Sequence, residues 1–417
     1  MIKNPSLRNL VLIWLGWAIV MGAFQRWVGM RVEPKRPDHV LFWTATETAA
    51  GSQRDKAYLS DPFLNEHVSW DSEFYLSVAA VGYDDPAVRA IPSNFKSGLG
   101  PYCTAGTDSD CHSLSYAFFP IYPMATRLVA LPLRLLGLTP IARSTLAAVI
   151  VSMLGALGAM IALYSMTRAS LGEEGGVRAG FYLLIFPSGF FLAQVYTEGL
   201  TIGLTFGALA FLLARRWGWA ALLAALAVWT RPGLAILVLP MAIVWWADRP
   251  WRDGLKSALT RGLAAFAPAI AYGAWASTRL AQEFFLVEKL FFGRKLLAVG
   301  PSLAMWGEAL QSFLKGGTPT AFYFGLEFAA LALAVAACVL LLRERFELAA
   351  FGLAMIVFAL TSNSAQGMVR YVLPVAPIFW VLARWGRRPA FDRLWSLLSI
   401  LLMGMEAMLF TFDFWVA

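Results

Sequence analysis

The sequence predicts an all-α protein that crosses a membrane many times, and three features of its composition predict it. Of its 417 residues, 59% are hydrophobic and only 14% are charged, against about 25% charged residues in ordinary soluble domains. The mean hydropathy is +0.62. Many of the 17 tryptophans stand at the ends of apolar stretches, where indole rings anchor helices at the lipid headgroups. We therefore expect one integral membrane domain covering residues 1–417.

Apolar stretches mark about 11 candidate transmembrane helices, several of them short and broken by proline. They lie near 9–30, 143–166, 179–193, 199–214, 218–229, 233–247, 260–279, 320–342, 348–362, 371–385 and 394–414. A helix needs about 20 residues to cross the hydrocarbon, so the shorter stretches must be broken or paired. Pro187, Gly189 and the polar run 194–199 favour a break within 180–214. The first stretch lacks a small-residue cleavage site, and we expect it to be a retained span rather than a signal peptide.

The Lys/Arg distribution predicts which loops share a side of the membrane, because cytoplasmic turns are enriched in these residues. With the N-terminus inside, the inner turns carry Lys3, Arg8, Arg168, Arg178, Arg215, Arg216, Arg249, Arg252, Lys256, Arg343, Arg345, Arg387, Arg388 and Arg393. The outer side then receives the long loop 31–142, the loop 280–320 and three tight turns at 194–198, 230–232 and 363–370. This distribution accounts for the formal charge of +8 without a nucleic-acid partner.

Residues 117–138 are apolar enough to be a span, but counting them as one would place the later basic turns outside. Their three prolines instead predict juxtamembrane helices within the first outer loop. In the same loop, Cys103 and Cys111 bracket a polar stretch, so they form either a disulfide on an oxidising face or two free thiols.

Metal and nucleotide motifs are weak or missing. Asp108 and Asp110 have the D-x-D spacing of some metal sites, yet three residues in an acidic loop are more typical of a solvated surface. His67 and His112 have no second ligand at helical spacing. No metal site is predicted, and a divalent metal is unsupported. The sequence also lacks a G-x-G-x-x-G or Walker motif, which makes ATP-driven work unexpected.

Four charged residues fall on the predicted outer side: Asp71, Glu198, Arg231 and Arg370. A charge at membrane depth costs about 2.5 to 3.5 kcal/mol, so such residues usually line a cavity and have partners. Each arginine lies close to a proline, where a helix is interrupted and a guanidinium can offer its planar donors to a phosphate. The alternative is an arginine that reaches the headgroups or pairs with Glu198.

Two further segments allow two interpretations. Asp71 is either an N-cap for the following helix or the leading end of an amphipathic helix that lies flat on the membrane, with Tyr75, Val78 and Ala79 at helical spacing. Lys289, Arg294 and Lys295 alternate with aromatic residues in the loop 280–320. This pattern is typical either of a cover over an anionic lipid headgroup or of simple interfacial packing.

Four stretches resemble a known family. They are HVSWDSEFYLSVAAVGY, FFPIYPMATRLVA, QVYTEGLTIGLTFGALAFLLARRWGWAALLAALAVWTRPGLAILVLP and RYVLPVAPIFWVLA, spread over about residues 67–385. They are similar to bacterial relatives of the PIG-V mannosyltransferases of GPI-anchor assembly, in the GT-C superfamily of polytopic glycosyltransferases. Matching motifs are Trp70-Asp71, Phe119-Pro120, Thr197-Glu198, Thr230-Arg231-Pro232 and Arg370-Tyr371. The eukaryotic enzymes tend to carry His directly before Trp-Asp, whereas here Ser69 stands there.

The resemblance implies a GT-C fold and an inverting transfer of a hexose, with mannose expected, from a polyprenyl-phosphate donor to a lipid or glycan hydroxyl. The implied site is in an outer loop of a bacterial plasma membrane, with Asp71 as general base and Arg231 and Arg370 on the donor phosphate. Residues expected to bind or orient the sugar are Trp70, Tyr75, Tyr196, Glu198 and Tyr371. For Trp70, Tyr75 and Tyr196 the alternative is aromatic core packing, and for Glu198 it is the orientation of an arginine. The alternatives are a lipid or glycolipid transporter or flippase, in which the charges would line a path, and a non-catalytic accessory subunit.

Overall fold

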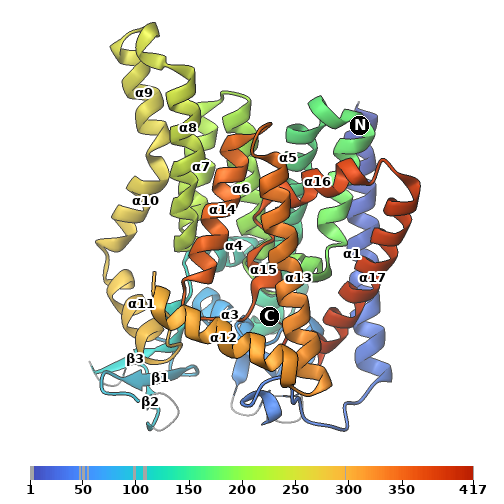
Figure 1. Cartoon of the computed structure of the whole chain (residues 1–417). Coiled ribbons are helices and arrows are strands. Elements are labelled where there is room, and N and C mark those ends of the chain that lie inside the picture. Colours follow the sequence, from blue (N-terminus) through green and yellow to red (C-terminus); the bar gives the residue numbers. More distant parts are fainter. Residues whose placement is uncertain are drawn as a thin grey trace.

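The computed structural model describes residues 4–46, 48, 52–53, 56–96, 100–106, 110–295 and 297–416. Helices dominate the described chain, and they form a bundle with irregular segments at its ends (Figure 1). The predicted fold class, an all-α polytopic membrane protein, is confirmed. The bundle is held by contacts of α5 with α1, α6 and α16, and of α13 with α14.

Four of the described helices are long and apolar enough to cross a membrane. They are α1 Pro5–Arg31, α5 Pro140–Leu184, α13 Thr318–Leu341 and α17 Pro389–Thr411. A fifth crossing is possible by composition in the pair η6 Pro187–Ala193 and α6 Glu198–Leu213, which is bent by 101° at the break predicted near residues 187–199. The shorter apolar helices are α7 Trp217–Val228, η7 Pro232–Leu237 continued by α8 Val238–Asp248, and α14 Phe346–Leu360.

Several predicted spans have different boundaries. The predicted spans 143–166 and 179–193 begin in two helices that together make up α5 and meet at a kink at Gly172, whose φ of 77° is incompatible with helix. The second of these helices ends at Leu184, before the predicted boundary at 193. The predicted span 260–279 is divided into α9 Leu255–Ala265 and α10 Ala267–Ala276, and 371–385 into α15 Met368–Tyr371 and α16 Ala376–Trp385. Proline accounts for the last two breaks, because Pro268 begins one new helix and Pro374 ends another.

The two long loops contain the remaining elements. The helical ones are η1 Thr44–Thr46, η2 Ala57–Leu59, η3 Asn65–His67, α3 Ser72–Ala80, η4 Leu114–Ala117, α4 Ile121–Ala130, η5 Pro132–Leu136, α11 Arg279–Leu290 and α12 Val299–Lys315, while η8 Pro250–Asp253 lies between α8 and α9. A small antiparallel sheet, not predicted, has the order β2-β1-β3 with β1 Arg89–Pro92, β2 Cys103–Thr104 and β3 Cys111–Ser113. Cys103 and Cys111 form a disulfide across its outer strands.

The expectation that residues 72–80 lie flat on the membrane is wrong. Ser72 to Ala79 are all buried, and α3 packs against α4, α5 and η2 inside the protein. Its small residues, such as Ser72 and Ser77, make this close approach possible. Arg127 of α4 donates to the carbonyl oxygens of Val78 and Ala79 and so satisfies the end of α3.

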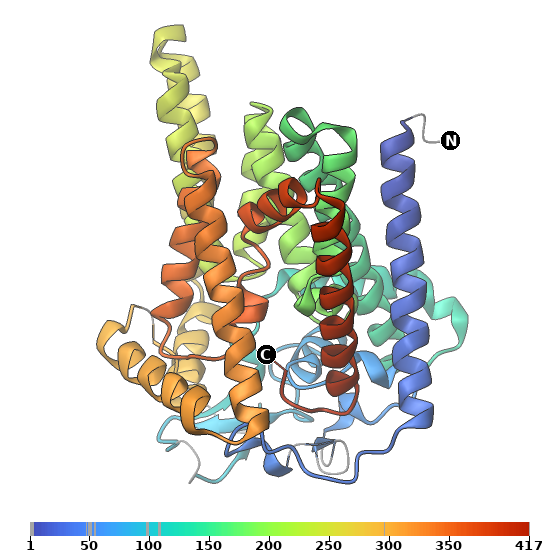
Figure 2. The same ribbon diagram turned by 45° about the vertical axis from the view of Figure 1, so that its right-hand side comes forward.

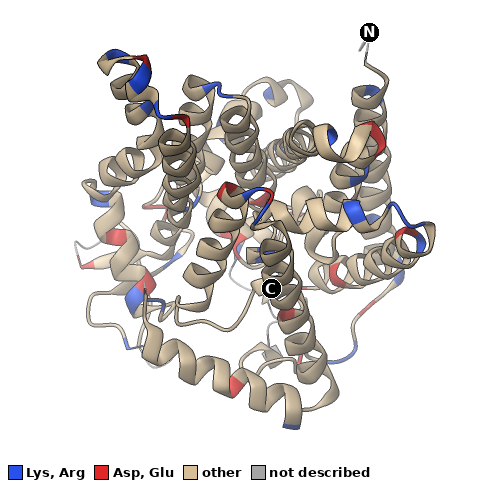
Figure 3. Cartoon of the chain, turned by 45° about the horizontal axis from the view of Figure 1, so that its top comes forward, with Lys and Arg blue, Asp and Glu red and all other residues tan. Residues whose placement is uncertain are grey.

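The predicted sorting of loops agrees with the arrangement of the bundle. The sheet, α11 and α12 lie at one end, and the N-terminus and the start of α9 lie at the other (Figure 1). After a turn of 45°, α1 and α17 are seen to lie side by side at the edge of the bundle (Figure 2). Charged residues concentrate near the ends of the helices, while long stretches of ribbon between them carry none (Figure 3). The two long loops therefore share one end, opposite the N-terminus.

Glycines allow α5 and α6 to approach closely enough to position the start of α6. A Cβ on Gly155 of α5 would lie 2.4 Å from the backbone carbonyl of Gly199. A Cβ on Gly199 would lie 2.1 Å from the carbonyl oxygen of Ser152, and Gly203 approaches Gly155 in the same way. This is the small-residue packing common between membrane helices.

We predict that Gly155→Ala lowers the stability by about 1 to 3 kcal/mol, because the rigid backbone of α6 cannot move aside. Thermal unfolding of the purified protein in detergent measures the effect. Gly158 is the matched control: it lies in the same helix, and an added Cβ would meet nothing within 4 Å. Gly158→Ala should leave the midpoint unchanged or raise it slightly. Equal effects of the two substitutions would contradict this packing.

Candidate active site

Two acids and two arginines from distant parts of the chain form one charge cluster. Glu198 Oε1 lies 2.6 Å from a terminal nitrogen of Arg231 and 3.5 Å from Nε of Arg370. Arg370 Nη1 lies 3.5 Å from Asp71 Oδ2. The order Arg231, Glu198, Arg370, Asp71 alternates in sign. The four charged residues expected to share one side of the membrane are therefore in contact.

Asp71 occupies a tight turn that presents its carboxylate to Arg370. Trp70, the preceding residue, has a φ of 53°, which is unusual for a bulky side chain. The Tyr196 hydroxyl holds the turn from behind, since it donates to the Ser69 carbonyl and accepts from the Asp71 backbone N–H. Asp71 stands at the N-cap position of α3, but its side chain caps no backbone N–H. With 29% of its side chain exposed, it is available to a ligand, and the N-cap interpretation is not supported.

Glu198 lies at the first position of α6, where the helix dipole favours a negative charge. Its side chain is only 1% exposed. The break before it, which turns the chain between η6 and α6, places the helix N-terminus inside the protein. Burying a carboxylate at this depth requires partners, and the two arginines supply them.

Each arginine is directed by the backbone break beside it. Arg231 precedes Pro232 and is therefore extended, with φ −162° and ψ 122°. Arg370 lies in the four-residue helix α15, which starts after Gly367 in the left-handed region at φ 79°. Glu327 of α13 accepts hydrogen bonds from the backbone N–H groups of Gly367 and Val369. It thereby fixes the helix that carries Arg370.

Aromatic rings surround the two guanidinium groups. Arg231 and Arg370 lie 5.3 Å and 5.4 Å from the ring centre of Tyr371. Arg370 also lies 5.4 Å from the ring of Phe191 and 5.3 Å from that of Tyr196. Contacts of this kind help to stabilise a cation that has lost its water.

A cavity of about 490 Å³ opens onto this cluster. Some of its lining side chains are charged or polar, namely Asp71, Thr230, Arg231, Glu288, Lys289, Arg294, Lys295, Ser362, Arg370 and Tyr371. Others are apolar or aromatic, including Phe118, Phe119, Phe284, Phe285, Phe292, Met355 and Phe358. A lining of both kinds suits a ligand with an anionic head and an apolar body.

Most of the residues expected from the sequence occupy one of two kinds of position. Asp71, Tyr75, Arg231, Arg370 and Tyr371 line the cavity. Glu198 and Tyr196 are buried behind it, as partners of lining residues.

Trp70 does not line the cavity either. Its ring packs edge-on against Trp43 and Trp415, and its indole N–H donates to the carbonyl of Phe414. Trp70 and Tyr196 therefore hold the turn at Asp71 and do not offer a stacking surface to a sugar in this cavity.

The second long loop supplies lining residues that the sequence identified only as a general cover. Lys289, Arg294 and Lys295, together with Phe284 and Phe292, come from α11 and the segment that follows it. Glu288, which was missed, also lines the cavity. Burial raises the pKa of Glu288, and the nearby Arg294 opposes this change. The mixture of basic and aromatic residues in 280–320 was the available signal, but it does not reveal which residues face inward.

The two histidines considered as ligands have structural partners. His67 Nδ1 lies 3.1 Å from the Ala193 carbonyl oxygen and 3.2 Å from Gln194 Oε1, both acceptors, so this nitrogen carries the proton. Burial lowers the pKa of His67, which favours the neutral ring. His112 joins Ser93 of the sheet end to Glu283 of α11 at 2.8 Å and 2.6 Å.

Among the described residues, no group of three or more His, Cys, Asp or Glu side chains is placed to hold a metal ion. Asp108 of the D-x-D motif lies outside the described residues.

No protein-family model and no curated protein matches this chain. Among solved structures, the oligosaccharyltransferase of Archaeoglobus fulgidus tethered to an acceptor peptide is similar, with a TM-score of 0.46 and 12% identity over 99% of this chain and 56% of that one. Its complex with zinc and sulfate gives 0.42 and 13% over 95% and 53%. The archaeal enzyme AglB with an inhibitory peptide and dolichol-phosphate gives 0.42 and 12% over 95% and 56%.

The chain spans about half the length of these structures.

We predict that Glu198→Ala lowers the stability by about 3 to 5 kcal/mol, because it leaves the buried Arg370 and the half-buried Arg231 without their shared partner. Glu198→Gln, which keeps an acceptor oxygen, should cost less. The measurement is thermal unfolding in detergent. Glu344 is the control, since it forms a two-pronged pair with Arg384 but is 49% exposed; Glu344→Ala should cost less than about 1 kcal/mol. Similar losses at both positions would contradict a central role for Glu198.

Proposed function

We propose that this protein is a glycosyltransferase of the GT-C type that uses a polyprenyl-phosphate sugar as donor and inverts the configuration at the sugar. The observation that carries the proposal is the position of Asp71. Its partly exposed carboxylate lines a cavity that also presents Arg231 and Arg370, and it lies 3.5 Å from Arg370. A carboxylate beside guanidinium groups in one cavity can accept a proton from a hydroxyl while a phosphate leaves next to it.

The lining of the cavity, which contains both basic and apolar side chains, supports a lipid-linked donor. The phosphate of such a donor is anionic, and Arg231 and Arg370 present planar N–H donors that match its oxygens. The isoprenoid chain is apolar, and the rings of Phe119, Phe285 and Phe358 line the same cavity. The lipid phosphodiester is itself the activated leaving group, which explains why the chain needs no nucleotide-binding motif.

In the proposed reaction, the acceptor hydroxyl transfers its proton to the carboxylate of Asp71. The acceptor oxygen attacks C1 of the sugar from the face opposite the phosphate. The bond between C1 and the phosphate oxygen breaks, and its electron pair stays with the leaving polyprenyl phosphate. The phosphate then carries one more negative charge than before, which Arg231 and Arg370 stabilise. Glu198 holds both arginines, and Tyr75 and Tyr371, which line the cavity, are the aromatic residues that we assign to the sugar.

The proposal also includes the membrane face on which the site lies and the identity of the donor and the acceptor. The disulfide between Cys103 and Cys111 lies in the same loop as Asp71, and disulfides form in oxidising compartments. This supports a site at the outer face, which for a bacterial plasma membrane is the periplasmic or extracellular side. A hexose donor, mannose first, and a lipid or glycan acceptor follow from the resemblance to the PIG-V relatives.

We expect Asp71→Asn to lower sugar transfer by about 100- to 10,000-fold, because the amide cannot accept the proton. The assay incubates the purified protein with radiolabelled polyprenyl-phosphate mannose and a bacterial lipid extract, and it follows the release of polyprenyl phosphate. Asp61→Asn is the control, since Asp61 accepts a hydrogen bond from Thr139 at the protein surface. Undiminished turnover by a folded Asp71→Asn variant would remove Asp71 from the mechanism.

Arg231→Ala should raise the KM for the donor by about 10- to 100-fold, the value of a hydrogen bond to a charged group. Arg231→Lys keeps the charge but loses the planar fork, so it should restore only part of the affinity. Steady-state kinetics with increasing donor concentration measure both. Arg215→Ala is the control because Arg215 pairs with Asp248 outside the cavity. Normal donor kinetics of Arg231→Ala would refute the phosphate assignment.

A further inference from the structure

The segment that follows α17, residues 412–416, packs against the turn that carries Asp71. Asp413 is buried, and its carboxylate accepts hydrogen bonds from the Ser69 hydroxyl and, at 2.7 Å, from the Ser52 hydroxyl. The carbonyl of Phe414 accepts the indole N–H of Trp70 at 3.3 Å. Both residues immediately before Asp71 are therefore bound by this segment.

Three indole rings form the centre of the contact. The ring centre of Trp415 lies 5.0 Å from that of Trp70 and 4.9 Å from that of Trp43, and those two rings are 5.8 Å apart. All three pairs meet edge to face, the arrangement that aromatic rings prefer. The backbone N–H of Trp415 donates to Asp38 at 2.8 Å, which ties the same residue to the start of the first loop.

The segment also reaches the helix that carries Arg370. The indole N–H of Trp415 donates to the Tyr323 hydroxyl at 3.1 Å. The same hydroxyl accepts the backbone N–H of Gly367 at 3.3 Å. Glu327 holds the N-terminus of α15, as described above. One side chain, Trp415, thus connects the Asp71 turn with the support of Arg370.

The backbone of both partners needs this mutual support. Trp70 has a φ of 53° and Asp413 a φ of 59°, both in the left-handed region. Residues other than glycine stay in this region only where their surroundings hold them. The hydrogen bonds of Asp413 and Phe414 and the packing of Trp415 provide such surroundings on one side of the turn, and Tyr196 provides them on the other.

We propose that residues 412–416 are a positioning element for the reaction. They fix the Asp71 carboxylate relative to Arg370, because they bind Ser69 and Trp70 next to Asp71 and Tyr323 next to the helix of Arg370. Neither Asp413 nor Trp415 lines the cavity, so the segment acts through Asp71 and Arg370 and touches no substrate. The proposal rests on the proposed function for its kinetic consequence, but its structural consequence can be measured without any substrate.

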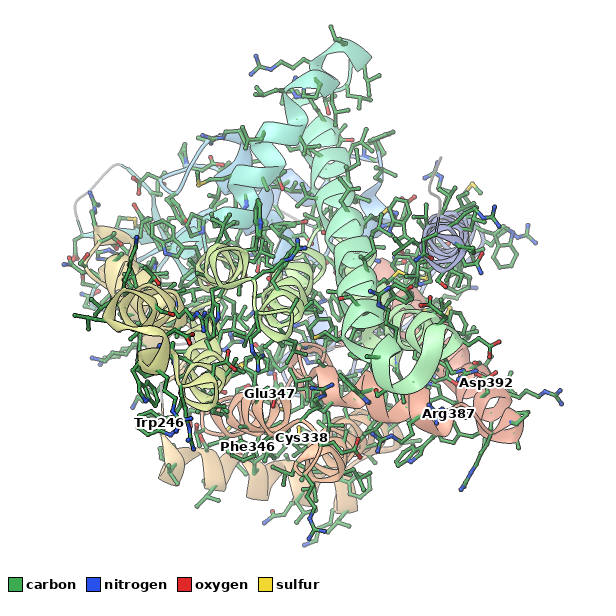
Figure 4. The ribbon with its side chains drawn as sticks, turned by 90° about the horizontal axis from the view of Figure 1, so that it is seen from above. Trp246, Cys338, Phe346, Glu347, Arg387 and Asp392 are labelled. Atoms are coloured by element: carbon green, nitrogen blue, oxygen red, sulfur yellow. A yellow bond between two sulfur atoms is a disulfide. The ribbon has the colours of Figure 1, made fainter. Side chains whose placement is uncertain are left out.

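The structural test is amide hydrogen exchange of the purified full chain. Trp415→Ala should increase the exchange of residues 69–75 and 367–371 by about tenfold or more, because local opening becomes easier when packing is lost. Trp415→Phe keeps a ring but loses the bond to Tyr323, so residues 367–371 should respond more than residues 69–75. Trp246→Ala is the control, since Trp246 is 68% exposed and lies at the rim of the bundle (Figure 4). Unchanged exchange of both segments in folded Trp415→Ala would overturn the proposal.

The kinetic test uses the same variants in the transfer assay. Trp415→Ala should lower kcat by about 10- to 100-fold while changing the KM for the donor less than threefold, as expected when reacting groups are misplaced and not removed. In the Asp71→Asn background, Trp415→Ala should lower the residual transfer by a smaller factor than in the wild-type protein, because part of its effect passes through Asp71. Full additivity of the two losses would show that Trp415 does not act through Asp71.

The two tests separate the two proposals. If the wild-type protein transfers no sugar but Trp415→Ala opens both segments, the proposed function fails and the positioning role of residues 412–416 stands. If transfer is normal in Trp415→Ala and exchange is unchanged, the positioning role fails and the proposed function is unaffected.

Discussion

The buried carboxylate of Glu198 is the interaction on which the rest of the site depends. Moving an ion out of water costs several kcal/mol, and one neighbour of opposite charge rarely compensates for it. Glu198 has two such neighbours, Arg231 and Arg370, and Arg370 has a second acid, Asp71. In this alternating series each interior charge lies between two of opposite sign. The series explains how four ionised groups can meet in a chain that is otherwise so apolar.

The breaks in the helices and the charges require each other. Unpaired backbone groups are tolerated at membrane depth only where protein or a cavity surrounds them. The chain is interrupted before Glu198, at Arg231 and before Arg370, and each interruption leaves backbone groups that need partners. Glu327 supplies such partners at the third interruption, while the breaks let the charged groups leave the lipid. A continuous helix at any of the three positions would carry its charge along the bundle and away from the cluster.

The sequence could predict which charged residues lie together but not the orientation of the side chains around them. Charges beside proline in an apolar chain indicate a polar site, and this reasoning found Asp71, Glu198, Arg231 and Arg370. It could not decide between sugar binding and core packing for the rings of Trp70 and Tyr196, because the direction of a side chain in an irregular turn follows no periodicity. It offered the membrane surface as one of two interpretations for α3, since an amphipathic spacing looks the same against lipid and against a protein interior. The short strands and the contact between Trp70 and residues 412–416 leave no local pattern, because the first are two to four residues long and the second spans most of the chain.

The basic lining residues outside the alternating series can stabilise the charge that appears on the leaving phosphate. In the series, Arg231 and Arg370 are already largely balanced by Glu198 and Asp71. Within the described residues, Lys289, Arg294 and Lys295 line the same cavity and form no salt bridge. Glu288 is the acidic lining residue from the same segment. In the proposed reaction Asp71 becomes neutral when it takes the proton, which frees Arg370, while the leaving phosphate gains a negative charge. The positive potential of the cavity therefore rises at the step at which the new charge appears, and the second long loop adds to it. A site that gains positive potential as the phosphate gains charge binds the transition state more tightly than the donor, which is the condition for catalysis.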